Sequence, residues 1–330
     1  MTCPLPEAAT GRLRGAGCEI VTLPDGVPLG DAARHGALVG VDALVCTLTD
    51  RVDAAVLDAA PDLAVVATVS VGHEHIDTAH AARREVVVRT TPGALDAATA
   101  DLTMLLILAA CRRSSDAEAT VRGATWTGWR LDQHLGLDLD GGRLGIVGWG
   151  RIGRAVAARA AAFGLEVIHH ARRPTGDASF VADLDELLAR SDVVSLHVPL
   201  TPDTRHLIDG RRLGLLRPTA VLVNTSRGAV VDEAALAEAL HAGRLFGAGL
   251  DVYESEPDVH PRLRSAPGVT LLPHIGSATV RTRARMADLA VDGVLDALAA
   301  HPTSADRDRP TRRRIPYRST ATAHEETQRP

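Results

Sequence analysis

The segment Gly148-Trp149-Gly150-Arg151-Ile152-Gly153 has the glycine spacing of a turn that holds the diphosphate of a dinucleotide. In such a turn Gly148 would make the tight bend, Gly150 would let the backbone approach the diphosphate, and Gly153 would let helix and strand pack closely. A strand-like apolar run, 144–147, precedes the turn, and a helical pattern follows it. This context predicts a dinucleotide site rather than an incidental glycine-rich bend.

Basic residues stand where such a site usually carries an acid. An Asp or Glu about 20 residues after the turn normally binds the adenosine ribose hydroxyls. Here the second strand ends in His169-His170-Ala171-Arg172-Arg173, with Ala171 in the position of the acid. Because guanidinium groups attract a 2′-phosphate and a carboxylate repels it, Arg172 and Arg173 favour NADP(H) over NAD(H). The alternative is that both are ordinary solvated loop residues, and NAD(H) then stays possible.

Three further residues could carry acid–base chemistry. His274 could donate a proton to a carbonyl group that receives hydride, because imidazole titrates near neutral pH. Glu256 could pair with His274 and hold it protonated. Arg227 offers a fixed fork of donors to a carboxylate or a carbonyl oxygen. Each also has a plain alternative, as a surface histidine, a loop acid before a proline and an arginine that caps a turn, so the argument depends on the three lying together.

The elements that would bring them together form a regular series. Short apolar strands alternate with helices from residue 143 onward, which predicts an α/β fold with a Rossmann-type, doubly wound parallel sheet. The strand-like runs are 144–147, 167–168, 193–198, 220–223, 247–250 and 269–272. Ligands of such sheets bind at the carboxyl ends of the strands. The glycine turn, the arginine pair, Arg227, Glu256 and His274 all follow strand ends, so we expect them on one rim.

The rest of the chain predicts a second, smaller domain. Residues 1–95 show a weaker alternation, with strand-like runs at 19–22, 43–46, 64–67 and 86–88, which indicates a flavodoxin-like α/β domain. We expect residues 281–301 to return to this domain and residues 96–280 to form the NAD(P)-binding Rossmann domain. Pro, Thr, Ser, Arg and Glu dominate residues 302–330, which predicts a disordered tail.

The composition excludes several classes of function. The 330 residues are 45% hydrophobic and 23% charged, the profile of a soluble globular protein. They include no lysine, which excludes Schiff-base chemistry on a lysine. The four cysteines lack the spacing of metal ligands, so we expect free thiols in the cytoplasm and no metal site. The net charge of −5, with seven arginines against four acids in 302–330, leaves an acidic body that argues against nucleic-acid binding.

The sequence also predicts neither a membrane span nor an export signal. The longest apolar run, 104–111, is too short to cross a bilayer and is typical of a buried helix. The first residues contain neither a basic segment nor an apolar segment of the kind that signal peptides carry. We therefore expect a cytoplasmic protein.

Four motifs resemble those of the D-isomer-specific 2-hydroxyacid dehydrogenases, and within that family most of all the glyoxylate/hydroxypyruvate reductases. They are Gly148–Gly153, Asn224–Asp232, Gly249–Pro257 and Leu272–Ala278. The likeness covers about residues 3–300 and its motifs are specific. The resemblance implies reduction of a small 2-oxo acid to the D-2-hydroxy acid by hydride transfer from NAD(P)H, with the smaller domain binding substrate.

The resemblance also implies a role for each matching residue. Arg227 would bind and polarise the 2-oxo acid, His274 would protonate its carbonyl oxygen, and Glu256 would orient and charge His274. The backbone amides of Ser70, Val71 and Gly72 would hold the substrate carboxylate. Asp251 would face the nicotinamide carboxamide, and Thr103 would lie near the same ring. Other residues expected in the cofactor site are Arg151, Ile152, Val198, Pro199, Thr204, Thr225, Ser226 and Gly276. Trp126 and Trp129 match an arm that joins two subunits, so the resemblance implies a homodimer.

The chain departs from the family at three places. The usual strand ahead of Cys3-Pro4-Leu5-Pro6 is absent, so we expect lower stability than for a version extended upstream, measured as a difference in melting temperature. His73-Glu74-His75 replaces an aromatic–acid pair after the substrate loop, which could alter substrate choice. The tail at 302–330 replaces the usual closing segment.

Two other functions remain open from the sequence. One is a dehydrogenase of another small anion, such as a phosphonate, phosphite or a 3-phosphoglycerate-like compound, although the loop around 70–77 lacks the lysine that phosphite would favour. The other is a non-catalytic, NAD(H)-sensing binding protein like the corepressor branch of the family. The presence of Arg227, Glu256 and His274 favours an enzyme.

Overall fold

The computed structural model describes residues 1–24 and 26–300. The chain forms two compact units, one of Met1–Thr91 with the chain from Met286 onward, the other of Pro92–Arg285. The unit boundaries thus lie at 91/92 and 285/286, where we had placed the domain boundaries at 95/96 and 280/281. The tail predicted at 302–330 lies outside the described residues.

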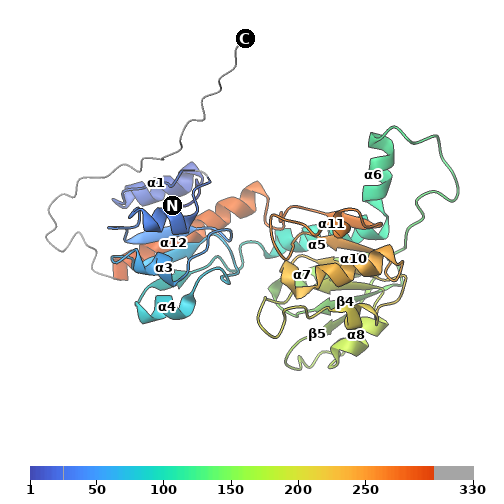
Figure 1. Ribbon diagram of the computed structural model, residues 1–330. Coiled ribbons are helices and arrows are strands. Elements are labelled where there is room, and N and C mark those ends of the chain that lie inside the picture. The colour runs from blue at the N-terminus through green and yellow to red at the C-terminus, as the bar shows by residue number, and fades with distance from the viewer. Residues whose placement is uncertain (25, 301–330) are drawn as a thin grey trace, which may run out of the picture. The chain divides into compact units, whose positions relative to one another are not determined.

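The second unit is built on six parallel strands in the order β5-β4-β6-β7-β8-β9. Two of them, β4 and β5, are labelled in Figure 1. These are β4 (Arg143–Val147), β5 (Glu166–His170), β6 (Val193–Leu196), β7 (Val221–Asn224), β8 (Gly247–Leu250) and β9 (Val269–Leu271). Phe180 adds a parallel bridge to His169 beyond β5. The chain therefore proceeds outward from β4 in one direction and returns to start β6 on the other side of β4, which confirms the doubly wound parallel sheet.

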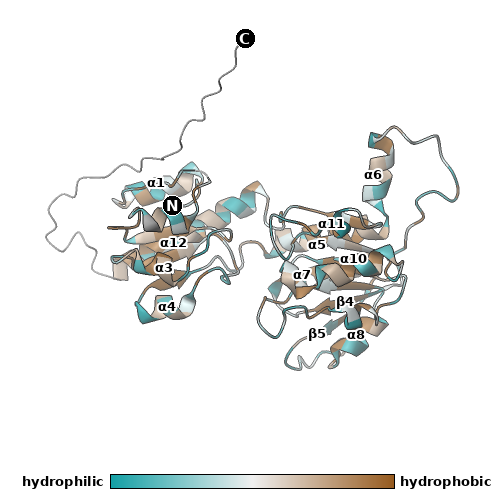
Figure 2. Ribbon diagram, in the orientation of Figure 1, coloured by the Kyte–Doolittle hydropathy of each residue, from teal (hydrophilic) through white to brown (hydrophobic). Residues whose placement is uncertain are grey.

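Helices cover both faces of this sheet. On one face lie α5 (Asp96–Cys111) and α7 (Arg151–Ala160). On the other lie α8 (Leu184–Arg190), α9 (Gly210–Leu213), α10 (Glu233–His241) and α11 (Pro261–Arg264). Successive residues of β7 contribute to opposite cores, Leu222 to one and Val223 to the other. Because both faces are buried, most strand positions are apolar, and the most hydrophobic residues are coloured brown in Figure 2.

Three elements of the second unit lie outside this layered arrangement. They are α6 (Ser114–Arg122) and the short turns of 3-10 helix η1 (Ala161–Phe163) and η2 (Gly228–Val230). The long helix α12 (Val280–Ala300) begins in the second unit and continues into the first. Within residues 1–24 and 26–300, no helix is long and apolar enough to cross a membrane.

The first unit has a three-stranded parallel sheet in the order β1-β2-β3, namely Ala43–Cys46, Val65–Thr68 and Val87–Arg89. One face packs on α2 (Leu29–Arg34), α3 (Ala54–Asp58) and α4 (Thr78–Arg83). The other face packs on α1 (Glu7–Gly15) and the C-terminal part of α12.

The strand predicted at 19–22 is wrong. That segment is irregular, and its hydrogen bonds go to the start of the chain: the Met1 amino group donates to the Val21 carbonyl at 2.6 Å, and the Leu23 N–H donates to the Met1 carbonyl at 2.9 Å. Thr2 in turn donates its N–H to the Val45 carbonyl of β1 at 3.0 Å. The first two residues therefore separate the 20–23 segment from the sheet.

Candidate active site

The glycine turn has the geometry that a dinucleotide diphosphate needs. Gly148 has a φ of 104°, and a Cβ there would lie 2.5 Å from the carbonyl oxygen of His197. A Cβ on Gly153 would lie 2.2 Å from the Gly148 carbonyl oxygen, whereas a Cβ on Gly150 would meet no atom within 4 Å. Gly150 precedes α7 without a side-chain cap, so the first N–H groups of this helix, including those of Arg151 and Ile152, are available to an anion. The residues present therefore fit the diphosphate of a nicotinamide dinucleotide.

Strand β5 runs two residues further than its apolar core. Gly148 donates its N–H to the His170 carbonyl at 3.0 Å, which ties the glycine turn to the end of β5. Trp149 stacks on His169, with ring centroids 3.9 Å apart and an interplanar angle of 12°. His169 is fully buried between Trp149 and Phe180, and this burial lowers its pKa. The chain after His170 therefore leaves the sheet beside the glycine turn.

Arg172 and Arg173 follow immediately. Both side chains are exposed, and neither guanidinium makes a hydrogen bond or an ion pair with another residue in the described part of the chain. They belong to the loop that follows His170, the residue to which Gly148 is hydrogen-bonded. An anionic group bound beside the glycine turn could thus reach cations that no other described residue engages.

The end of β6 contributes a histidine that the sequence analysis missed. His197 is the first residue after the strand, its Nε2 lies 2.8 Å from Ser195 Oγ, and burial lowers its pKa to about 3. The backbone carbonyl of His197 lies against Gly148, at the point where the strand order reverses, while its imidazole is turned to Ser195. Val198 and Pro199 come next. Thr204 donates its hydroxyl to the Pro199 carbonyl at 2.6 Å, so it braces this turn, and its expected role at the cofactor stays a prediction.

After β7, Asn224 shapes the turn that presents Arg227. The buried Asn224 amide donates to the Arg227 carbonyl at 2.9 Å, and its oxygen accepts from the Ser226 N–H at 3.0 Å and the Ser226 hydroxyl at 2.8 Å. Arg227 is partly exposed and donates one guanidinium hydrogen bond to the Ser226 carbonyl at 2.7 Å. Asn224, the first residue of the Asn224–Asp232 motif, thus holds the candidate substrate-binding arginine in place.

A chain of buried threonines connects α5 with two of the loops. Thr103 Oγ1 lies 2.9 Å from Thr225 Oγ1 and donates to the Thr99 carbonyl at 2.8 Å. Thr99 in turn donates to the Gly276 carbonyl at 3.2 Å. Thr103, Thr225 and Gly276, all expected in the cofactor site, therefore lie in one connected group.

The loop after β7 lies directly on the segment that follows β8. A Cβ built on Gly228 would lie 1.8 Å from the Tyr253 carbonyl carbon, 2.0 Å from its oxygen and 2.4 Å from the Glu254 nitrogen. Only glycine allows this approach. The contact places the residue after Arg227 against the segment that leads to Glu256.

Asp251 holds the turn that presents His274. The buried Asp251 carboxylate accepts the N–H groups of Ile275 and Gly276, each at 2.7 Å, and its backbone carbonyl accepts the His274 N–H at 2.8 Å. Burial raises the pKa of Asp251, and the hydrogen bonds from Ile275 and Gly276 offset this only in part. His274 has a φ of 54°, a left-handed conformation that is unfavourable for a residue with a side chain. These three bonds therefore stabilise a backbone conformation that His274 would not adopt by itself.

Glu256 and His274 form the predicted pair. His274 Nδ1 lies 2.7 Å from Glu256 Oε2, while Glu256 Oε1 accepts the Tyr253 N–H at 3.0 Å. Burial by itself raises the pKa of Glu256, but the hydrogen bonds from His274 and Tyr253 and the charges of His274 and Arg227 outweigh it, so the pKa lies below its ordinary value. The Glu256 carboxylate is thus bonded to His274 and also within the electrostatic influence of Arg227, at the rim of one sheet.

The predicted substrate loop belongs to the first unit. Ser70 is buried and donates its hydroxyl to the Gly72 carbonyl at 2.6 Å, while Val71 is exposed. Thr68 Oγ1 lies 2.8 Å from Ser70 Oγ and 3.1 Å from His75 Nε2. His75, one of the departures from the family pattern, thus supports the loop indirectly, through Thr68.

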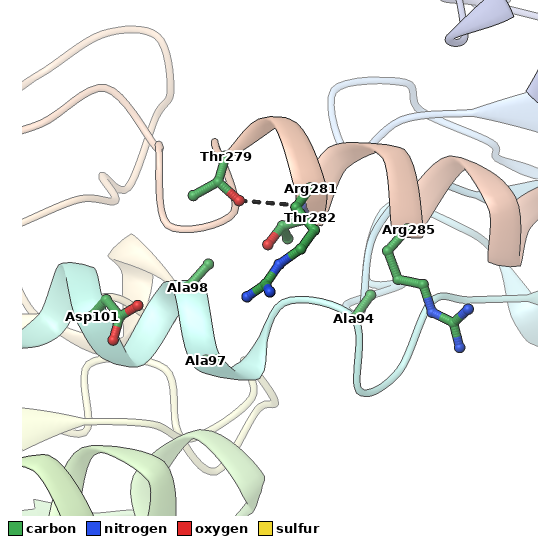
Figure 3. A pocket seen from close by; sticks show the side chains of 8 residues that line it. All are labelled: Ala94, Ala97, Ala98, Asp101, Thr279, Arg281, Thr282 and Arg285. Atoms are coloured by element: carbon green, nitrogen blue, oxygen red, sulfur yellow. Dashed lines mark hydrogen bonds between the residues drawn. The ribbon is translucent and has the colours of Figure 1, made fainter. Parts of the chain in front are cut away.

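A separate cleft of about 270 Å³ lies between the first turns of α12 and the N-terminal part of α5 (Figure 3). Its lining includes Arg281, Arg285 and Asp101, and Arg281 extends from α12 toward Ala98. None of the residues that we expected to carry chemistry lines this cleft. Among the described residues, no group of three or more His, Cys, Asp or Glu side chains is arranged to hold a metal ion.

Comparison with known proteins gives consistent results. Residues 104–276 match the family model for the NAD binding domain of D-isomer specific 2-hydroxyacid dehydrogenases. The chain is 46% identical to a glyoxylate reductase of Thermococcus litoralis over 264 residues, 77% of this chain and 80% of that protein.

Solved structures are similar along most of the chain. A protein from Thermus thermophilus superposes with a TM-score of 0.84 and 46% identity, covering 91% of this chain and 96% of that one. An NADPH-dependent glyoxylate/hydroxypyruvate reductase from Sinorhizobium meliloti, solved with NADP and malonate, superposes with a TM-score of 0.77 and 35% identity, covering 91% and 92%.

Proposed function

Because this chain belongs to the D-isomer specific 2-hydroxyacid dehydrogenases, we propose that it reduces glyoxylate to glycolate and hydroxypyruvate to D-glycerate, with NADPH as the preferred hydride donor. The observation that carries this proposal is the grouping of Arg227, Glu256 and His274 on the rim that also holds the glycine turn. The names of the similar proteins support the substrate class.

The residues divide the reaction between them. The nicotinamide, when bound, supplies the hydride that the carbonyl carbon of the substrate accepts. Arg227 binds the 2-oxo acid and draws electron density toward the carbonyl oxygen. Since His274 Nδ1 is engaged by Glu256, Nε2 is the ring nitrogen left to donate a proton to that oxygen. Glu256 stabilises the protonated imidazole, and a proton from solvent restores it after each turnover.

The substrate carboxylate needs a second anchor. We propose that the backbone amides of Ser70, Val71 and Gly72 bind it, as the motif of this loop implies. The hydrogen bond between Thr68 and Ser70, and that between His75 and Thr68, support a fixed arrangement of those amides.

The direct test is a comparison of initial rates. Glyoxylate and hydroxypyruvate should each be reduced with NADPH and with NADH under the same conditions. NADPH-selective turnover supports the whole proposal. NADH-selective turnover would support the proposed reaction and contradict the proposed preference for NADPH. No turnover with either cofactor would contradict the proposed reaction.

The cofactor preference is expected to depend on the arginine pair. Replacing both Arg172 and Arg173 by alanine should raise the KM for NADPH roughly tenfold or more, because each hydrogen bond to a charged phosphate contributes about 1.5–3 kcal/mol. The KM for NADH should change little, since NADH lacks the 2′-phosphate. Arg190→Ala, which removes an exposed partner of Glu186 on α8, is the control and should leave both values unchanged. Equal losses with both cofactors would contradict the assignment.

We also propose a homodimer joined through α6 and the segment after it. This region exposes Val121, Trp126, Trp129, Leu131 and Leu135, whose exposed fractions range from 57% to 81%. Such a row of large apolar side chains is unusual on a free surface and typical of an interface. The double substitution Trp129→Arg and Leu131→Asp is expected to convert a dimer into a monomer in light scattering after gel filtration. A wild-type protein that is monomeric at micromolar concentration would contradict the proposal.

A further inference from the structure

Two glutamates outside the catalytic group link the loops that carry Arg227 and Glu256. Glu254 Oε1 accepts the Glu233 N–H at 3.0 Å, and Glu233 Oε1 accepts the Glu254 N–H at 2.5 Å. Glu233 opens α10, six residues after Arg227, and Glu254 lies two residues before Glu256. Each carboxylate therefore binds the backbone of the other residue, which makes the link reciprocal.

A third segment joins this link. His206 Nε2 lies 3.0 Å from Glu254 Oε2, and the Arg205 guanidinium lies 3.8 Å from the same oxygen. His206 has a φ of 49° and donates its N–H to the Ala229 carbonyl at 2.7 Å. The Glu254 carboxylate thus connects the turn before α9, the start of α10 and the loop that carries Glu256.

The burial of the Glu233 carboxylate makes this arrangement unfavourable for the stability of the fold. Its side chain is almost fully enclosed, and burial raises its pKa, although the N–H groups of Glu254 and, at 3.4 Å, His260 are directed at it. A buried carboxylate costs stability unless hydrogen bonds compensate it. An apolar pair would hold two loops together at lower cost, but it would not fix them through directional bonds.

At Gly228 the two loops are in direct backbone contact, with no side chain of residue 228 between them. Gly228 lies directly on the backbone of Tyr253 and Glu254, so a shift of either loop changes the distance between Arg227 and Glu256. Tyr253, in the same segment, supplies the N–H that holds Glu256 Oε1. A displacement of the Glu233–Glu254 link would therefore move both the substrate-binding arginine and the Glu256–His274 pair.

We propose that Glu233 and Glu254 are positioning residues for the reduction, holding Arg227 and Glu256 at the spacing at which Glu256 stays on His274. This inference rests on the proposed function. Neither glutamate touches the substrate or the cofactor, and both act through the backbone of the two loops.

The test compares Glu254→Ala, Glu233→Ala and Glu254→Gln with wild type in hydroxypyruvate reduction. The alanine variants should lower kcat roughly tenfold or more, because misplacement of reacting groups by about 1 Å can cost as much as about 10²-fold. The KM for the nicotinamide cofactor should stay within about twofold, since the glycine turn is untouched. The alkaline limb of the kcat/KM profile should move to lower pH, as His274 loses the full effect of Glu256.

The conservative variant separates position from charge. In Glu254→Gln the amide oxygen can still accept the Glu233 N–H, and the amide nitrogen stays within reach of His206 Nε2. This variant should therefore keep kcat within about threefold of wild type and leave the alkaline limb in place. Glu238→Ala is the matched control, because Glu238 lies on α10 and pairs with the exposed Arg244, and it should behave as wild type.

The remaining outcomes would contradict either the inference or the proposed function. Wild-type kcat and an unshifted alkaline limb in both alanine variants would overturn the inference, even with a lowered melting temperature, because the glutamates would then serve stability alone. If an alanine variant does not fold, Glu254→Asp replaces it, since the shorter side chain withdraws the carboxylate from Glu233 and His206. A wild type without turnover, or a His274→Gln variant with full activity, would instead show that the proposed function has failed.

Discussion

His274→Gln is expected to lower kcat for 2-oxo acid reduction by about 10²- to 10⁴-fold, the contribution typical of general acid catalysis. Glutamine can still donate a hydrogen bond to the substrate oxygen, but it cannot transfer a proton to it. Binding of the cofactor should be unaffected, because His274 lies on the turn after β9 and the diphosphate site lies after β4. Steady-state kinetics with saturating NADPH and a cofactor titration by fluorescence together measure both quantities.

The companion substitution Glu256→Gln should have a smaller effect on kcat and a distinct effect on pH dependence. The lowered pKa of Glu256 shows that the positive charges of His274 and Arg227 favour its carboxylate form. Glu256→Gln removes the carboxylate that pairs with His274, so we expect the alkaline limb of kcat/KM to move to lower pH. His241→Gln, on the exposed side of α10, is the control for both variants. Unchanged kcat in His274→Gln would remove this histidine from the mechanism.

The methyl group added by Gly228→Ala is expected to lower both stability and activity strongly. Its Cβ would lie 1.8 Å from the Tyr253 carbonyl carbon and 2.4 Å from the Glu254 nitrogen, and neither backbone atom can move alone. We expect a loss of more than about 3 kcal/mol in the free energy of unfolding, at the upper end of overpacking effects. Any folded fraction should have low kcat, since the loops of Arg227 and Glu256 must separate. Urea unfolding and kinetics on the same sample measure the two effects.

A second glycine provides the matched control. At Gly210, in the first turn of α9, a Cβ would meet only the Ala235 side chain, at 3.6 Å, which is an ordinary contact. Gly210→Ala should therefore change the free energy of unfolding by no more than about 0.5 kcal/mol. If Gly228→Ala proved as stable and active as Gly210→Ala, the direct contact between the two loops would not matter to the site.

Much of the second unit follows from local pattern. Strands buried on both faces are mostly apolar, so β4, β6, β7 and β8 appear in the sequence as short runs rich in Val, Leu, Ile, Ala and Gly, with Ser195 as a buried exception within β6. A turn that approaches a diphosphate and a helix must lack side chains, so its glycines stand at fixed intervals. The ends of parallel strands lie on one rim, which is why the sequence predicts that Arg227, Glu256 and His274 lie together.

Other features depend on partners far away in the chain. The 19–22 segment has the residues of a strand, but Met1 and Thr2 occupy the place beside β1, and local sequence does not record that competition. The sequence shows Arg172 and Arg173 as a basic pair. It does not show that the Gly148 N–H bonds the His170 carbonyl, at the end of β5 that precedes this pair.

The types of the reacting side chains, the glycine turn and the order of strands are properties of this amino-acid sequence, because periodicity and backbone sterics act over a few residues. The three hydrogen bonds that Asp251 makes to the His274 turn, and the reciprocal bonds of Glu233 and Glu254, exist only once distant segments have packed. In the sequence these acids look like ordinary loop and helix-start residues. Burial and the direction of backbone N–H groups, which tertiary structure alone sets, turn them into supports of the site.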